Sequence, residues 1–385
     1  MGLISAGWDP GRLNNKLYLE DKKLINMNAI CSGYERRVLK KEEGNLENYL
    51  DVEVFRGDEY LGRYFVGRMA YNYNRGDLRW SANGVPKFSE VNSSYDEIIK
   101  MVTNLAFSQY DPNNPKKKVQ FCLGTGSPTE EYFEAPEVLE VFKEMMKVPY
   151  KVVFKHELFN NAEIEVVVPK MYFKPEGTAS LISMTYNDNL SISKIAKDIF
   201  DKGYKVIGMN IGSSTTDIAI MKPDMEFDEN GFFGIDVGSS KALNEIRAIL
   251  YKGYGYDTTK LKVDYLIRNY TKVRYKGEII DLNEIKKRPF ENLIALLKTK
   301  FYDEVERRGI DIGEAGALFI SGGTVVLIED KLNEFIHGVP SKFSTDPLFE
   351  DARGYFLEAK TQQLLEAASE KEIFENDEDK IYVVS

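Results

Sequence analysis

The sequence has 385 residues, of which 43% are hydrophobic and 29% are charged, and its formal net charge is −10. This composition predicts a soluble globular protein with core enough for two domains or one large one, and its acidic excess excludes a strong fixed attraction to nucleic acid. No apolar run approaches the ~18 residues of a membrane span and the start lacks a signal-peptide pattern, so we expect a cytoplasmic protein with no direct nucleic-acid or membrane partner.

Cysteine and histidine are too few for several common kinds of site. Cys31 and Cys122 lie in apolar segments without a CxxC partner, which predicts buried free thiols in a reducing compartment. His156 and His337 are far apart in the sequence, which argues against a zinc site or a serine–histidine triad.

The first half of the chain predicts a strand meander followed by alternating helices and strands. Apolar and polar residues alternate in segments 2–9, 16–20, 24–31, 50–57 and 60–67, as in mostly antiparallel strands. Helices are predicted at 93–110 and 136–146, strands at 118–126, 150–156 and 162–173, and a turn entering a helix at 174–184. The basic run 116–118 is predicted as a solvated loop, with a phosphate-binding patch as the alternative.

The second half repeats this order of elements. Strands at 205–212 and 216–221 flank a short loop, and a helix at 239–255 ends in glycine. A hairpin is predicted at 272–282, a long helix at 283–309, and a strand, a diglycine turn and another helix at 316–332. Because each half has a strand, a tight turn and a returning strand near its beginning, we expect two related α/β domains facing each other across a cleft.

The stretch "GWDPGRLNNKL" is the first candidate site. A glycine turn at Gly11 lets backbone N–H groups approach an anion, and Asn14 lies in the same turn before the second strand. Asp9 is suited to order waters around Mg²⁺, while Lys16 offers a positive charge to a β- or γ-phosphate. An ordinary Asp-Pro-Gly turn is the alternative.

The stretch "NIGSSTTD" forms a second loop of the same shape, with Gly212, Ser213, Ser214 and Thr215 at its bend and Asp217 at its end. Two such hairpins from opposite domains would hold a triphosphate between them. The similar stretch "GIDVGSSKALNEI" runs into a helix instead of a returning strand. It either flanks a base or ribose or belongs to the core.

Two further segments carry candidate residues. In "ISGGT", Gly322 and Gly323 remove side chains between a strand and the next element, so that a purine or ribose-phosphate can lie against the backbone, with Thr324 beside them. A tight structural turn is the alternative. In "KPEGTA", Glu176 follows Pro175 in a turn, where an isolated glutamate is most often a surface residue.

In this order and spacing, four stretches resemble segments of the actin, heat-shock chaperone and sugar kinase superfamily. "WDPGRLNNK" resembles its first phosphate loop, "KPEGTA" its catalytic connecting segment, "NIGSSTTD" its second phosphate loop and "ISGGT" its adenosine loop. Within it, "LGTGSPTEEY", "ARGYFLEA" and "KPEG" most resemble the ParM-type bacterial actins, which are plasmid-segregation ATPases. The similarity covers roughly residues 3–359, apart from 34–50.

The resemblance implies a role for each matching position. Asp9 and Lys16 face magnesium and phosphate, and Glu176 positions the attacking water. Asp217 matches the acidic residue that closes the second loop. The remaining nucleotide-binding positions are Gly11, Asn14, Gly212, Ser213, Ser214, Gly322, Gly323 and Thr324.

Asn210 departs from this pattern, because the family has an aspartate there that helps to hold the hydrated metal. The amide oxygen of Asn210 can still accept a hydrogen bond from a metal-bound water, so we assign Asp9 and Asn210 to the metal site and Glu176, Asp9 and Asn210 to catalysis. The departure has three interpretations: a naturally slow hydrolase, a substitution introduced to trap a filament, or compensation by Asp217 or Asp9.

The resemblance thus predicts two actin-like, ribonuclease H-like domains around a nucleotide cleft. Their boundaries are expected at 1–177, with 347–385 returning to this domain, and at 178–346. The implied protein binds ATP or ADP with Mg²⁺, hydrolyses ATP, polymerises with itself, and segregates plasmid DNA through a DNA-binding adaptor of the ParR type. The alternatives are a sugar or small-metabolite kinase of the same fold, and a nucleotide-gated scaffold with little turnover.

Overall fold

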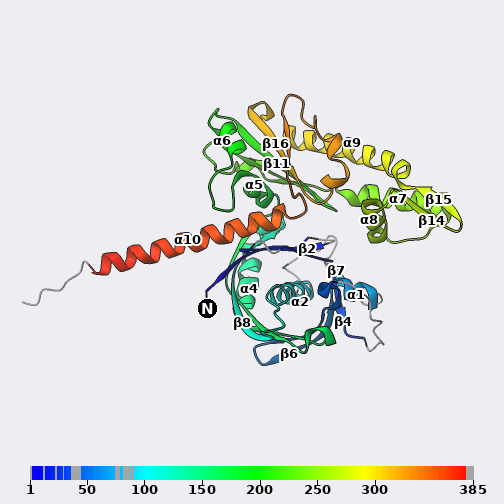
Figure 1. The fold of residues 1–385 in the computed structure, drawn as a ribbon. Coiled ribbons are helices and arrows are strands. Elements are labelled where there is room, and N and C mark those ends of the chain that lie inside the picture. The colour runs from blue at the N-terminus through cyan, green and yellow to red at the C-terminus, as the bar shows by residue number, and fades with distance from the viewer. Residues whose placement is uncertain are drawn as a thin grey trace, which may run out of the picture.

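A computed structural model describes residues 2–11, 14–21, 24–28, 30–35, 45–73, 79–80, 88 and 91–378. In this part of the chain, two α/β halves lie one above the other, and helix α10 (Glu350–Glu378) runs between them and projects beyond both (Figure 1). Each half has its own sheet and its own hydrophobic core.

The first half is built on one curled sheet. Its described strands are β1 (Ile4–Asp9), β2 (Asn14–Leu19), β3 (Leu24–Asn28), β4 (Ile30–Gly33), β5 (Asp51–Arg56), β6 (Glu59–Val66), β7 (Arg79–Trp80), β8 (Lys116–Ser127), β9 (Tyr150–Phe154) and β10 (Glu163–Pro175). They pair in the order β3-β2-β1-β8-β10-β9-β5-β6-β4-β7.

The sheet curls around helix α2 (Val91–Ser108), as Figure 1 shows. Ile98, Val102 and Leu105 of α2 recur at helical spacing and are fully buried against the sheet, which fixes the helix by its apolar face. The other helices of this half are α1 (Arg68–Tyr73), α3 (Thr129–Glu134) and α4 (Pro136–Lys147), with 3₁₀ turns at Leu46–Tyr49 and Glu157–Phe159.

The second half has a smaller sheet with helices around it. Its strands are β11 (Lys205–Ile211), β12 (Thr216–Met221), β13 (Phe233–Ile235), β16 (Ala315–Ser321) and β17 (Ser341–Phe343), and a separate hairpin joins β14 (Lys272–Tyr275) to β15 (Glu278–Asp281). The helices are α5 (Thr178–Thr185), α6 (Lys194–Phe200), α7 (Ser239–Tyr254), α8 (Lys260–Asn269) and α9 (Leu282–Arg308). 3₁₀ turns lie at Glu229–Gly231, Ile312–Glu314, Val325–Leu327 and Glu329–Lys331.

The two sheets repeat one topology. The small sheet has the order β13-β12-β11-β16-β17, and the corresponding strands of the large sheet are β3-β2-β1-β8-β10. In both sets the first two pairings are antiparallel and the next two are parallel. The prediction of two related α/β domains is therefore confirmed, and the β1–β2 and β11–β12 hairpins hold equivalent places.

Helix α10 packs against both halves through its first turns. A Cβ on Gly7 of β1 would collide with the carbonyl of Ala352, and a Cβ on Gly354 would collide with the carbonyl of Ala179 in α5. Glycine at these two positions thus allows α10 to approach both backbones closely. Phe356 adds an apolar contact, with its ring 5.3 Å from that of Tyr18.

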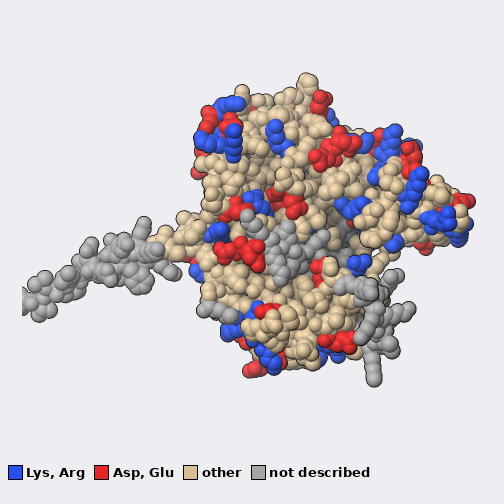
Figure 2. Space-filling view, in the orientation of Figure 1, with Lys and Arg blue, Asp and Glu red and all other residues tan. Residues whose placement is uncertain are grey.

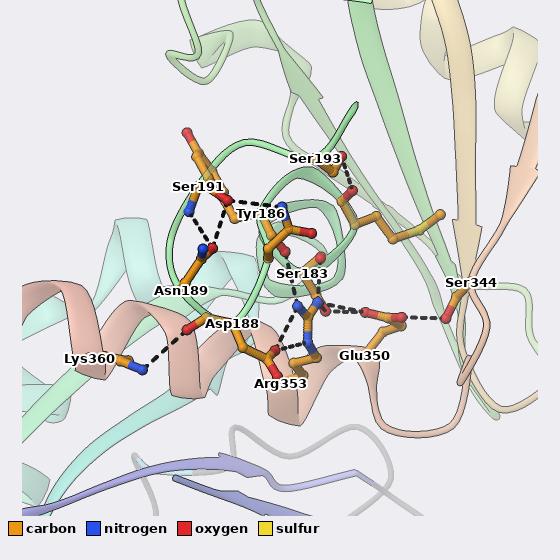
Figure 3. A network of polar contacts seen from close by, with 12 residues as sticks. Ser183, Tyr186, Asp188, Asn189, Ser191, Ser193, Ser344, Glu350, Arg353 and Lys360 are labelled. Carbon is orange, nitrogen blue, oxygen red and sulfur yellow. Dashed lines mark hydrogen bonds and ion pairs between the residues drawn. The ribbon is translucent and has the colours of Figure 1, made fainter. Parts of the chain in front are cut away.

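A polar network around Arg353 holds this first part of α10 to α5 (Figure 3). The Arg353 guanidinium donates to the Asp188 carboxylate at 2.8 Å, to the Ser183 hydroxyl at 2.7 Å and to the Tyr186 carbonyl at 3.0 Å. The buried Glu350 carboxylate accepts hydrogen bonds from Ser183 and Ser344. These bonds fix the rotation of α10 about its axis.

Most predicted elements are confirmed. The predicted hairpin turns at Lys276 and Gly277, both with positive φ, and Gly309 ends α9 in the left-handed conformation. Both predicted free cysteines are buried and unpaired. No helix in the described ranges is long and apolar enough to cross a membrane.

Two predictions about the regular structure are wrong. The segment after "ISGGT" forms short 3₁₀ turns instead of a helix, because the N–H groups of Leu327 and Ile328 bond to carbonyls three residues back. The basic run 116–118 lies in β8 instead of a loop, because Lys116 and Lys118 pair across the sheet with glutamates of β10.

Candidate functional site

The two equivalent hairpins point toward one another across the junction of the two halves. Cross-strand pairing places Asp9 opposite Lys16 in the first hairpin and Asn210 opposite Asp217 in the second. Each hairpin thus presents a matched pair of polar side chains next to its turn. In both hairpins the two paired side chains are seven residues apart in the sequence.

The first hairpin carries an ion pair between Lys16 and Asp9, both of them largely buried. The backbone at Gly11 passes so close to the carbonyl of Asn14 that a side chain would not fit. The chain therefore approaches itself closely at Gly11 and Asn14, and the Lys16–Asp9 ion pair lies next to this point.

Hydrogen bonds within the turn and from neighbouring segments support the second hairpin. The N–H of Gly212 donates to the Thr215 carbonyl at 2.9 Å, which closes the turn. The Thr324 hydroxyl donates to the Gly212 carbonyl at 2.7 Å, and the N–H of Ser240 donates to the Ser213 carbonyl at 2.7 Å. The stretch "GIDVGSSKALNEI" thus supports the loop from the core side, and Ser239 from the same stretch reaches the cleft.

The two remaining predicted segments meet the hairpins. Glu176 follows the end of β10, and its N–H donates to the Ser127 carbonyl at 2.8 Å. Gly322 has a φ of 100°, and a Cβ there would collide with the Asn210 side chain. Gly322 therefore makes room for residue 210, while Gly323 lies at the cleft surface.

These segments enclose a cleft with about 1030 Å³ of empty space, part of it open to solvent. The enclosed cavity itself has a volume of about 210 Å³, below the roughly 300–1,000 Å³ of typical small-molecule sites. Every predicted site residue lines the cleft except Gly322: Asp9, Gly11, Asn14, Lys16, Glu176, Asn210, Gly212, Ser213, Ser214, Asp217, Gly323 and Thr324. On the face shown in Figure 2, acidic and basic side chains lie close together along the band where the two halves meet.

Several residues of the cleft were not predicted from the sequence. Asp264 and Arg268 come from α8 and form an ion pair at 2.9 Å, and Arg268 also donates to the Gly323 carbonyl at 2.9 Å. Their spacing of four residues is typical of a solvated helix face, so the pattern gave no reason to place them here. The others are Ser239, Leu348, Asp351 and Tyr355.

Asp351, in the first turn of α10, is the unpredicted cleft residue that contacts Asn210, the position at which the sequence departs from the family pattern. The Asn210 side-chain amide donates to Asp351 Oδ2 at 2.6 Å. Burial, followed by the negative charge of Asp9, raises the pKa of Asp351 to about 7. The side chain beside Asn210 is thus a carboxylate from another part of the chain.

The cleft suits a hydrated divalent cation better than a metal held by protein alone. Within the described ranges, no three His, Cys, Asp or Glu side chains converge to hold a metal ion. Mg²⁺ usually keeps several waters and is bound through one or two carboxylates and the phosphates of a nucleotide. The Oδ1 atoms of Asn210 and Asp351 are buried without a hydrogen-bond partner among the described residues, so acceptor atoms remain for such a cation.

Comparison with solved structures identifies the fold. An archaeal actin homolog aligns with a TM-score of 0.70 and 16% identity, covering 93% of this chain and 100% of the other. ParM from a Clostridium botulinum filament described as 15-stranded aligns with a TM-score of 0.71 and 19% identity, covering 94% and 100%. ADP-bound ParM from Bacillus thuringiensis aligns with a TM-score of 0.68 and 14% identity, covering 94% and 99%.

The chain therefore has the two-domain, actin-like fold found in ParM, as the sequence resemblance predicts. No protein-family model and no curated protein matches the sequence. At these identities, the likeness to solved structures establishes the fold alone.

Proposed function

We propose that the chain is an ATPase that polymerises with itself when it binds ATP. The observation that carries this proposal is the pair of equivalent hairpins, which bring Asp9, Lys16, Asn210 and Asp217 to one cleft beside Glu176. A triphosphate that contacts both domains can favour one relative orientation of the domains over another. Binding of the nucleotide can in this way control assembly.

Each group has a role in this proposal. Lys16 holds a terminal phosphate by its charge, and the N–H groups of Ser213 and Ser214 contact the phosphate chain next to Gly212, whose own N–H closes the turn. Glu176 accepts a hydrogen bond from the attacking water and orients it for in-line attack. The diglycine turn and Arg268 border the space for the nucleoside.

Asp9 and the Asn210–Asp351 pair are the groups that would hold Mg²⁺ through its waters. When bound, Mg²⁺ neutralises the charge that develops on the transferred phosphate. The protein residues then supply orientation: the Lys16 ion pair holds Asp9 in place, and the bond from Asn210 holds Asp351.

We also propose that the chain divides into domain 1–177 with the returning segment 347–385, and domain 178–346. The separate cores support this division, since α5 packs with the second sheet through Leu181, while the start of α10 contacts both halves. The resemblance of "LGTGSPTEEY", "ARGYFLEA" and "KPEG" to the ParM-type actins leads us to propose plasmid segregation as the cellular role, with a ParR-type adaptor linking the filament to DNA.

The test is light scattering and electron microscopy of the purified protein with ATP, ADP or no nucleotide, with phosphate release measured in parallel. We expect filaments with ATP and phosphate release that follows assembly. Phosphate transfer only when a sugar or metabolite hydroxyl is added, without filaments, would identify the kinase alternative. Filaments that form equally well without nucleotide would contradict nucleotide control.

A further inference from the structure

Asp351 places a buried carboxylate at the second hairpin, where the sequence has an amide. Only 9% of Asp351 is exposed, and it makes no ion pair with any described residue. Its Oδ2 accepts the bond from Asn210, and its Oδ1 has no partner in the described ranges. A carboxylate buried in this way is costly unless a positive charge comes to it.

The orientation of the pair follows from its chemistry. The NH₂ group of Asn210 faces Asp351 and donates to it, which suits the ionised carboxylate, and the amide oxygen faces away from Asp351. An amide in this position holds a carboxylate without adding charge. An aspartate at position 210 would instead face Asp351 as a second negative group.

Side-chain contacts of two neighbouring residues on α10 hold Asp351 in this place. Glu350 and Arg353 form hydrogen bonds with Ser183, Asp188 and Tyr186 on one face of α10 (Figure 3), while Asp351 on another face lines the cleft. Tyr355, one helical turn after Asp351, lines the same cleft. The position of the carboxylate is thus fixed by the fold and does not depend on a flexible loop.

We propose that Asp351 supplies the negative charge for the cation site of the second hairpin, and that Asn210 is its positioning residue. The charge that the resemblance leads one to expect at position 210 on β11 thus comes from the start of α10. Asp9 is paired with Lys16 and Asp217 accepts the Thr215 hydroxyl at 3.2 Å, whereas the carboxylate of Asp351 contacts the Asn210 side chain directly. This inference rests on the proposed nucleotide binding.

The test measures the affinity for a non-hydrolysable ATP analogue in EDTA and across a magnesium titration. Asp351→Asn removes the charge but keeps the shape, so we expect the affinity in EDTA to stay equal or increase and the gain from Mg²⁺ to fall by about 10- to 100-fold. The exchanged variant Asn210→Asp/Asp351→Asn keeps one carboxylate, one amide and their hydrogen bond. We expect it to regain most of the magnesium effect.

Glu358→Gln is the matched control, because Glu358 is a largely buried carboxylate on the same helix that pairs with Lys174 at 3.2 Å outside the cleft. We expect its magnesium dependence to equal that of the parent. Thermal melting with and without Mg²⁺ and the analogue gives a second readout that does not depend on turnover. It should show a smaller stabilisation by Mg²⁺ in Asp351→Asn alone.

A folded Asp351→Asn protein with the magnesium dependence of the parent would overturn the inference while leaving nucleotide binding intact. Should Asp351→Asn not fold, the exchanged variant decides: parent-like magnesium dependence supports the inference, and its loss in a folded protein overturns it. Failure of the parent to bind the analogue under any condition would overturn the proposed function as well.

Discussion

Removing Arg353 should destabilise the whole protein, because this side chain holds α10 to α5. In Arg353→Ala, the hydrogen bonds to Asp188, Ser183 and Tyr186 are lost, and the buried Glu350 loses the positive charge 3.9 Å away. Breaking one partner out of a buried charged network costs about 3–5 kcal/mol. We expect the lower end, about 3 kcal/mol, because Asp188 is partly exposed and can be solvated.

The loss should also depend on pH. Burial raises the pKa of Glu350, while hydrogen bonds from Ser183 and Ser344 and the charge of Arg353 oppose that shift. Without Arg353 the pKa of Glu350 rises further in the folded state, so the folded variant takes up a proton more readily than the unfolded chain. The penalty is therefore fully present above this raised pKa and shrinks as the pH falls through it.

The assay is urea unfolding of parent and variant followed by circular dichroism, at a mildly acidic and a mildly alkaline pH. Arg307→Ala is the control, because Arg307 on α9 also bonds a glutamate, Glu304, but is largely exposed. We expect no measurable change for the control. Equal unfolding midpoints for Arg353→Ala, Arg307→Ala and the parent would refute the assigned role of the network.

Three further outcomes are expected. Lys16→Ala should weaken ATP binding by about 10- to 100-fold in a fluorescence titration, since a charged hydrogen bond contributes about 1.5–3 kcal/mol, and an unchanged affinity would argue against the assigned cleft. Glu176→Gln should leave filament assembly intact and slow phosphate release by at least about 100-fold; normal turnover would remove Glu176 from catalysis. Burial raises the pKa of the Cys122 thiol to about 11 and that of Cys31 further, so an aromatic disulfide reagent near neutral pH should label them only after unfolding, and rapid labelling of the native protein would contradict this burial.

The sequence alone determined the parts of the site that depend on neighbouring residues. A turn of glycine and small polar residues between two strands fixes a hairpin, and the hairpin register then sets which side chains lie opposite each other. Asp9 with Lys16 and Asn210 with Asp217 follow from such local patterns. The repeated order of strand, turn and strand was enough to predict two related domains.

Only the tertiary structure decided which distant groups join these hairpins. Asn210 and Asp351 are 141 residues apart, and the approach depends on glycines and polar contacts that hold α10 against both halves. Helix α10 itself was missed, since its later part projects away from the halves (Figure 1) and its sequence from residue 361 is mostly polar and acidic. A local sequence pattern predicts the face of a helix or strand on which a side chain lies. Which residue that side chain meets across a cleft depends on how whole helices and strands pack. For this reason the sequence showed the missing charge at position 210, and the fold alone placed Asp351 beside it.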